Sequence, residues 1–468
     1  MADLEGLLAR YRSLAPDVTR VIRSGKRIMI VTHIDADGLC SGSTVFAALM
    51  RKGANATLRT IPDLDSRAIA ELDTQNFDFY IFTDLGSSLV EEIGAAFQGR
   101  CLVLDHHQIQ EKDAANPSVV NSWRYGFDGG NEACSSAMAY FFASAVDPTN
   151  DDLSPLAVVG ALADRQDTGP GRSLTGLNRA AMEDAQARGL LTVTRDLMFT
   201  GRETRPIHEA IALTSTPFLK GLTGSKDAAL AALHQSGLTL KDGGTWRTIS
   251  SLSPEEKMKL TEVIASTLGP VDGATEAMAS LVGETYTFEF EDPFTPLRDA
   301  REFGTLLNAC GRMGAAGTGI SICLGDRTEA LNAAMKTLAD YRSGINKALG
   351  ALTSEPSRLE QHGIVILVNG EGIVDEKLLG PVISILTSSP EFKDKVVVGS
   401  AESRDSDLKI SSRVGDAFAG NVNLGVIMRE AAEAVDGVGG GHAMAAGAKI
   451  PSSKAESFSK AVVERISV

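Results

Sequence analysis

Residues 31–43 read VTHIDADGLCSGS and place an imidazole and two carboxylates, those of His33, Asp35 and Asp37, at every second position. Carboxylates and neutral imidazoles are side chains that bind manganese, magnesium or zinc, and no thiolate belongs to this set. The glycine after Asp37 lets the backbone approach a bound ion closely. This short stretch therefore predicts one part of a metal centre.

Further side chains of the same chemistry end later apolar runs. DFYIFTD ends at Asp84, and RCLVLDHH ends at Asp105, His106 and His107. SPLAVVGALAD ends at Asp164, and Asp167 follows three residues later. The chain has only seven histidines, and three of them lie in these clusters, which favours a metal site over a chance arrangement.

The combined set offers more ligands than one ion takes from a protein while still leaving room for water and substrate. Two ions about 3.5–4 Å apart, bridged by a carboxylate, fit the set better. Such a pair lowers the pKa of a shared water, holds a phosphate oxygen and offsets charge in the transition state. The predicted chemistry is phosphoester hydrolysis by in-line attack. No Walker lysine loop occurs, so a nucleotide-driven motor is not expected.

The elements that must position these groups alternate between strands and helices. RIMIVTH, ATLRTIP, DFYIFTDLG and RCLVLDHH read as strands, whereas residues 7–24 and SGSTVFAALMRKG have helical spacing. Pro16 is a candidate kink in the first helix. This alternation predicts an α/β fold with a mostly parallel sheet. Because ligands bind beyond the carboxyl ends of parallel strands, the clusters should converge on one crevice.

Size and composition limit the class of protein. A chain of 468 residues suggests about three domains. The formal charge of −15 argues against a protein that coats nucleic acid non-specifically, but not against a nuclease with a local basic groove. Five scattered cysteines without CxxC spacing indicate free thiols in a reducing cytosol. No apolar stretch is long enough for a membrane helix and no signal peptide is recognisable, so we expect a cytoplasmic protein.

The C-terminal half contains a second set of candidates, for phosphate binding. RTEALNAAMKTLADYRSGINKAL predicts one long linker helix, and GIVILVNG predicts a buried strand that begins the last domain. LKISSRVGD predicts a strand with Arg413 near its end, and the loop VGGGHAM exposes free backbone N–H groups to an anion. The candidate substrate-binding residues are Arg312, Arg413, Gly439, Gly440, Gly441 and His442.

Several of these stretches resemble a known superfamily. HIDADG, TDLGSS, LDHH and ALADRQD, in this order, look like the four motifs of the DHH phosphoesterases. GVGGGHAMAAGAKI resembles the glycine-rich loop of the DHH-associated C-terminal domain. Between them, AREFGTLLNACGRMG resembles a segment of RecJ-type exonucleases, and its sequence is most similar to that of the archaeal GINS-associated nucleases. The resemblance covers about two-thirds of the chain.

The resemblance also implies roles for the residues. One cation would be bound by His33, Asp35 and Asp84; the other by Asp37, Asp84, His106 and Asp164. Asp84 would then bridge two divalent cations, with manganese expected ahead of magnesium. His107 would lie beside the scissile phosphate as a hydrogen-bond donor, and Asp105 would orient the histidines.

The predicted domains are a catalytic domain (1–190), an insertion module (191–325), a linker helix (326–355) and a smaller α/β substrate-binding domain (356–468). The insertion module includes the NACGR segment. It resembles a module shared with a eukaryotic replicative-helicase component, which implies a replication or repair partner such as GINS. SPEEKMKLTEVIASTL in this module carries a capping box, with Ser253 at the cap and Glu256 three residues on.

Three functions fit this sequence. The first is a metal-dependent exonuclease for single-stranded DNA or RNA, because a narrow cleft admits one strand and rejects a duplex. The second is a phosphodiesterase that acts on short oligoribonucleotides or cyclic dinucleotides, which long and short labelled substrates would distinguish. The third is a replication scaffold with reduced catalysis, which the complete ligand set disfavours.

Overall fold

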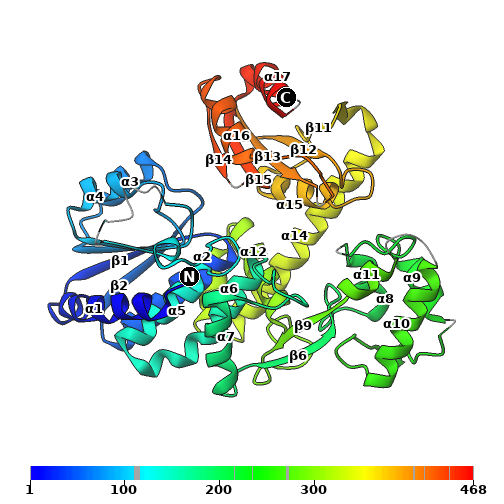
Figure 1. Cartoon of the computed structure of the whole chain (residues 1–468), viewed down its shortest axis with the longest axis horizontal. Helices are drawn as coiled ribbons and strands as arrows, with labels where there is room; N and C mark the ends of the chain where they lie inside the picture. The colour runs from blue at the N-terminus through cyan, green and yellow to red at the C-terminus, as the bar shows by residue number, and fades with distance from the viewer. Residues whose placement is uncertain are drawn as a thin grey trace. The chain divides into compact units, whose positions relative to one another are not determined.

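The structure is a computed structural model that describes all residues except 1, 110–115, 117, 216, 235, 270–273, 404–405, 416, 442 and 467–468. The chain divides into two compact units, which are drawn in Figure 1. One comprises residues 1–211 and 230–337, and the other comprises residues 212–229 and 338–468. None of the helices in the described part combines the length and the apolar character needed to cross a bilayer.

The first unit is built around a five-stranded sheet with the order β2-β1-β3-β4-β5. Its strands are β1 (Arg27–His33), β2 (Asn55–Ile61), β3 (Phe79–Thr83), β4 (Cys101–Asp105) and β5 (Val119–Asn121). Every pair is parallel, which confirms the predicted parallel α/β sheet. All carboxyl ends therefore meet at one edge.

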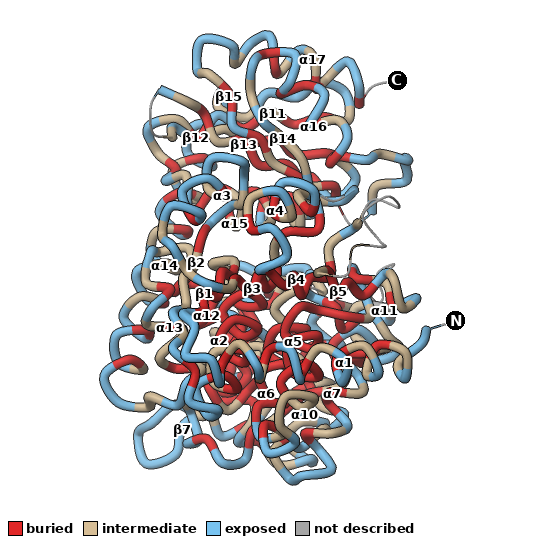
Figure 2. Tube along the Cα trace, turned by 90° about the vertical axis from the view of Figure 1, so that its left-hand side faces the viewer, coloured by how far each residue is buried: buried red, intermediate tan, exposed pale blue. Residues whose placement is uncertain are grey.

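Helices cover both faces of this sheet, which explains why its strands are continuous apolar runs (Figure 1). One face packs on α3 (Ser66–Asp73) and α4 (Val90–Phe97) through an apolar cluster that includes Tyr80, Phe82 and Phe97. On the other side lie α1 (Leu4–Arg23), α2 (Ala36–Arg51), α5 (Ser135–Val146), α6 (Ser154–Ala163) and α7 (Gly176–Ala187). The tube of Figure 2 shows the buried residues concentrated in the strands and in α2, α5 and α6.

Helix α1 is continuous through Pro16, so the predicted kink does not end it. Proline removes one backbone hydrogen bond from a helix. The carbonyl that loses its partner is that of Arg12, whose side chain is exposed, so water can hydrate this part of the helix. Two short 3₁₀ helices also belong to this unit: η1 (Ser122–Tyr125), which follows β5, and η2 (Pro148–Leu153), which follows α5.

The middle of the chain contains a short antiparallel ribbon and several helices. The ribbon pairs β6 (Thr192–Leu197) with β9 (Val282–Thr287), and β7 (Lys241–Asp242) forms a hairpin with β8 (Thr245–Trp246). The helices are α8 (Ile207–Leu213), α9 (Lys226–His234), α10 (Pro254–Leu268) and α11 (Ala274–Ser280). The predicted capping box at the start of α10 is confirmed, because Ser253 and Glu256 cap each other's backbone N–H groups.

Three helices follow this region: α12 (Ala300–Arg312), α13 (Ala316–Cys323) and α14 (Glu329–Ser354). Helix α14 confirms the long helix predicted from RTEALNAAMKTLADYRSGINKAL and extends five residues beyond that stretch. Helix α12 carries the NACGR segment and contacts α2 and α6 of the first unit.

The second unit contains a six-stranded mixed sheet with the order β10-β11-β12-β13-β15-β14. The strands are β10 (Leu359–His362), β11 (Val365–Asn369), β12 (Val396–Glu402), β13 (Asp407–Val414), β14 (Val438–Gly441) and β15 (Ala445–Pro451), with helices α15 (Glu376–Thr387), α16 (Leu424–Glu433) and α17 (Ala455–Ile466). Only the β11–β12 pair is parallel. The glycine stretch predicted as a loop is thus partly a strand: Gly439 pairs with Ala448, and Gly441 pairs with Ala446. Strand β14 lies at the sheet edge and has one neighbour.

Candidate metal centre

The carboxyl edge of the parallel sheet brings the predicted ligands together in two clusters. In the first, the Nδ1 atom of His33 lies 2.9 Å from an Asp35 oxygen and 3.6 Å from Asp84 Oδ2. In the second, the Nε2 atom of His106 lies 3.3 Å from Asp84 Oδ1, 3.6 Å from Asp164 and 3.9 Å from Asp37. Donor atoms lie within 4.8 Å of one another, close enough to share an ion, in the group of His33, Asp35 and Asp84 and in the group of Asp37, His106 and Asp164. The same holds for a third group that joins Asp84 and His106 to Asp105 and His107. Asp84 directs one oxygen toward each cluster.

Asp84 follows the last residue of β3 and adopts a left-handed backbone conformation, with φ of 61°. A left-handed conformation costs most residues roughly 1–2 kcal/mol, and aspartate tolerates it better than most. The backbone N–H of Asp84 still donates to the Leu104 carbonyl at 3.1 Å, so the turn is held against β4. Such outliers cluster at functional sites, and this one places the buried carboxylate between the two imidazoles.

Asp37 is fixed by the first residues of α5. Its two carboxylate oxygens accept hydrogen bonds from the backbone N–H groups of Ser135 at 2.7 Å and Ser136 at 2.8 Å. The carboxylate also packs against Gly160 of α6, where a Cβ atom would lie only 2.4 Å from Asp37 Oδ1. The glycine within the apolar run LAVVGALA is therefore a requirement of this close packing.

Backbone carbonyls orient both imidazoles. The Nε2 atom of His33 lies 3.1 Å from the Pro62 carbonyl, and the Nδ1 atom of His106 lies 2.6 Å from the Gly129 carbonyl. In the neutral rings these nitrogens carry the proton, which leaves the other nitrogen of each ring unprotonated and facing the carboxylates. This is the arrangement that metal-binding histidines use.

The residues that support His106 were not among those predicted from the sequence. Gln166 donates to the same Gly129 carbonyl at 2.9 Å, and its own carbonyl accepts from Asn178 at 2.6 Å. All three residues are distant from His106 along the chain. The only local signal was the position of Gln166 within the ALADRQD motif.

Asp105 and His107 form a hydrogen-bonded pair at the same edge. An Asp105 oxygen lies 2.8 Å from His107 Nδ1 and accepts from the backbone N–H of His106 at 2.8 Å. Burial opposes the charge on Asp105, but the neighbouring His107 imidazole holds the pKa of this carboxyl well below its usual range. Asp105 therefore orients the His107 ring directly and hydrogen-bonds His106 through the backbone N–H of that residue.

The remaining carboxylates repel one another at close range. Burial and then the charge of Asp84 raise the pKa of Asp37 to about 6. Burial and then the charge of Asp37 raise the pKa of Asp164 well above its usual value. Buried charges of one sign need a counter-charge. The nitrogen and oxygen donors, with no thiolate among them, suit manganese or magnesium, so the residues fit the predicted divalent cations.

Asp167 does not join either cluster. Its buried carboxylate receives Arg301 at 2.7 Å and Arg172 at 3.0 Å. Of the two aspartates considered in the ALADRQD motif, only Asp164 faces the other candidate ligands. Asp167 instead ties this motif to α12.

Helix α12 supports the first motif in two more places. Asn308 Oδ1 accepts from the backbone N–H of Ala36 at 3.0 Å. A Cβ atom at Gly311 would lie 1.7 Å from the Ile34 carbonyl, so only glycine fits against this turn. The neighbouring Arg312 is half-buried and has no side-chain hydrogen bond or ion pair among the residues that the structure describes.

The predicted substrate-binding residues of the second unit lie on β13 and β14. The guanidinium of Arg413 hydrogen-bonds Ser384 Oγ at 3.2 Å and the Ser412 carbonyl at 2.8 Å. Gly439, Gly440 and Gly441 belong to the edge strand β14. His442 lies outside the described residues.

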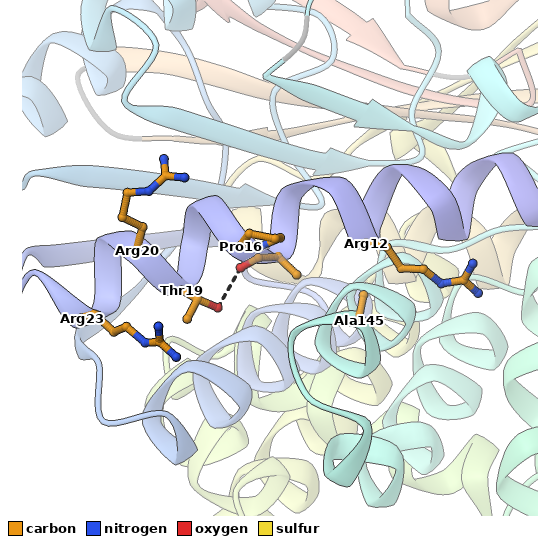
Figure 3. Close-up of a pocket in the computed structure, with 7 residues that line it drawn as sticks. Arg12, Pro16, Thr19, Arg20, Arg23 and Ala145 are labelled. Carbon is orange, nitrogen blue, oxygen red and sulfur yellow. Dashed lines mark hydrogen bonds between the residues drawn. The ribbon is translucent and has the colours of Figure 1, made fainter.

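A separate surface hollow of about 680 Å³ lies along α1 (Figure 3). It is lined by Arg12, Ala15, Pro16, Thr19, Arg20, Arg23 and Ala145. None of these residues belongs to the carboxylate and imidazole clusters, so the hollow is not part of the candidate metal centre.

Three segments of the chain match known domain families. Residues 27–162 match the DHH family N-terminal domain, residues 199–277 match the DHH-CID domain and residues 362–468 match the DHHA1 domain. An uncharacterized protein of Methanocaldococcus jannaschii is 29% identical over 446 residues, which are 94% of this chain and 93% of that protein.

Solved structures share the fold at low sequence identity. RecJ from Thermus thermophilus in complex with Mn²⁺ has a TM-score of 0.59 and 18% identity, with 97% of this chain and 54% of that chain covered. The chain thus spans about half the length of that RecJ. CDC45 from Entamoeba histolytica has a TM-score of 0.69 and 10% identity, with 98% and 99% covered. The same Thermus RecJ has also been solved in complex with Mg²⁺, with a TM-score of 0.53 and 17% identity, covering 97% of this chain and 52% of that one.

Proposed function

The chain is a DHH-superfamily protein with a RecJ-like fold, and on that premise we propose that it is a metal-dependent exonuclease. Its substrates are single-stranded DNA, RNA or both, and it hydrolyses their phosphodiester bonds. The observation that carries this proposal is the position of Asp84, whose two oxygens face two separate clusters of nitrogen and oxygen donors. A hydrolase that used only one cation would not need such a bridge.

In this proposal, His33, Asp35 and Asp84 hold one divalent cation, and Asp37, Asp84, His106 and Asp164 hold the other. Manganese is expected ahead of magnesium, and the RecJ structures solved with each ion support both. When bound, such a pair supplies an activated water and neutralises charge on the phosphate.

The chain's own residues then position the substrate. The side chain of His107 is 40% exposed, while its Nδ1 atom is fixed by buried Asp105. In this proposal, the Nε2 atom of His107 donates a hydrogen bond to a phosphate oxygen or to the leaving group. Burial lowers and the Asp105 charge raises the pKa of His107, with a net increase that favours the donor form.

Phosphate binding away from the cations is assigned to Arg312 and to the DHHA1-like region. There, Arg413, Gly439, Gly440, Gly441 and His442 are the proposed contacts. As an edge strand, β14 has backbone N–H groups without a second neighbouring strand. Arginine suits phosphate because its planar group can donate two parallel hydrogen bonds.

A role beside catalysis is favoured by one observation, the fold shared with CDC45 along nearly the whole length of both chains. We assign residues 1–190 to catalysis, 191–325 to binding of a replication or repair partner such as GINS, 326–355 to the linker and 356–468 to substrate binding. The relative in Methanocaldococcus jannaschii supports an archaeal setting.

End-labelled single strands test the proposal directly. DNA and RNA strands labelled at the 5′ or 3′ end are incubated with the protein and manganese, beside oligonucleotides of two to five residues. Stepwise, metal-dependent shortening of the long strands is expected. Cleavage of only the shortest substrates would favour an oligonucleotide phosphodiesterase, and no cleavage with full partner binding would favour a scaffold.

A further inference from the structure

Trp123 lies directly beside the candidate metal centre. It belongs to η1, which follows β5 at the same carboxyl edge of the sheet that carries the ligands. Its indole Nε1–H donates to the backbone carbonyl of His106 at 3.0 Å. One edge of the indole is therefore anchored one residue from His107.

The position of this indole is fixed by further contacts. Asn121 accepts from the backbone N–H of Trp123 at 3.0 Å and donates to the His107 carbonyl at 2.8 Å. A Cβ atom at Gly129 would lie 2.8 Å from Trp123 Nε1 and 1.8 Å from the His106 carbonyl, so the segment that packs here must be glycine. A rigid side chain loses little entropy when it binds a ligand.

The rest of the indole is open. Trp123 is 38% exposed, although the preceding strand β5 is buried. Among the described residues, no ring or cation stacks on it. Trp246, the other tryptophan of the chain, contrasts with it: the His208 ring lies 4.7 Å away and Lys241 lies 4.3 Å from its ring centroid.

We propose that Trp123 stacks on the nucleobase of the nucleotide bound at the metal centre. This inference rests on the proposed function and adds to it a contact to the base, whereas the contacts proposed above reach only the phosphate. Every base has a π-face, so stacking on one indole would favour nucleic acid without strong sequence preference.

Kinetics with and without bases test this role. The substrates are a thymidine oligonucleotide and an abasic strand with the same backbone. Trp123→Leu should raise the KM for the thymidine strand about ten-fold, because base stacking on an aromatic ring contributes about that much. The KM for the abasic strand should rise much less, because that strand has no base to stack on the indole. Trp123→Phe retains a ring but loses the Nε1–H donor, so its KM for the thymidine strand should lie between those of Trp123→Leu and wild type. Trp246→Phe is the matched control.

Fluorescence supplies a readout that needs no hydrolysis. In the Trp246→Phe background, Trp123 is the sole tryptophan, and the thymidine strand should quench its emission while the abasic strand should not. If the thymidine strand quenches Trp123 emission but is not cleaved, base stacking is supported and the proposed nuclease activity is refuted. Cleavage without quenching, or an equal loss of kcat on both strands in Trp123→Leu, would overturn stacking and leave Trp123 as a support for His106.

Discussion

Asp164→Asn should stabilise the metal-free protein while it weakens cation binding. The Asp164 side chain is about a quarter exposed and, among the described residues, its one close side-chain partner is His106. Burial and the charge of Asp37 both disfavour its ionised form. Asparagine has nearly the same shape, so the substitution removes the charge without leaving a cavity.

The neighbouring Asp37 sets the scale of this effect. Its pKa rises from 3.8 to about 6, which corresponds to about 3 kcal/mol of lost stability once both states are ionised. Because the folded state keeps this proton to higher pH than the unfolded chain, the unfolding free energy of metal-free protein falls as pH rises from about 4 to 6. At pH 8, Asp164→Asn should raise the unfolding free energy of the metal-free protein by roughly 1–3 kcal/mol, or its melting temperature by about 2–6 °C.

Thermal unfolding after chelation, repeated with saturating manganese, measures both parts of this prediction. Wild type should gain several degrees from manganese, since an ion at 100 times its Kd contributes about 2.7 kcal/mol, and the variant should gain much less. Asp17→Asn on α1, an exposed position with the same charge change, is the control and should move less than about 0.5 kcal/mol. A metal-free variant less stable than wild type, with an unchanged response to manganese, would refute the reasoning.

Three further substitutions test the site. Asp84→Ala should abolish hydrolysis of end-labelled strands, because it removes the bridge between the clusters; near-normal turnover would overturn the assignment. Asp167→Ala should destabilise the protein by about 3 kcal/mol, since it leaves Arg301 without its buried partner, yet metal stoichiometry measured by elemental analysis should stay at the wild-type value. Gly160→Ala should weaken manganese binding in calorimetry by about 10–100-fold by displacing Asp37, and wild-type affinity would show that this packing is unimportant.

The residues at the carboxyl edge of the parallel sheet could be predicted because the pattern that indicates them lies within short stretches of sequence. Each apolar run ends in the acidic or imidazole side chain that the parallel arrangement then collects at one edge. The strand order could not be predicted in the same way. The sequence RIMIVTH does not indicate that β1 lies between β2 and β3, because the strand order depends on packing between distant segments.

The two aspartates of ALADRQD show where sequence reasoning fails. Asp164 and Asp167 have the same chemistry and lie three residues apart, but only Asp164 faces the cluster. The partner that holds Asp167 is Arg301, 134 residues later. A pattern read over short windows cannot contain this pairing. The glycines of β14 were likewise predicted as a loop because their composition favours turns, whereas pairing with β15 makes them a strand.

The support that α12 gives to the first motif has a consequence for shortened genes. A fragment that stops after residue 190 would encode every candidate cation ligand but would lack Asn308, Gly311 and Arg301. The turn that carries Asp35 and Asp37 would lose its contacts with α12. The apolar parts of α2 and α6 that α12 covers would be exposed to water. Expression trials of a shortened catalytic part of this chain should therefore extend at least through residue 323, the end of α13.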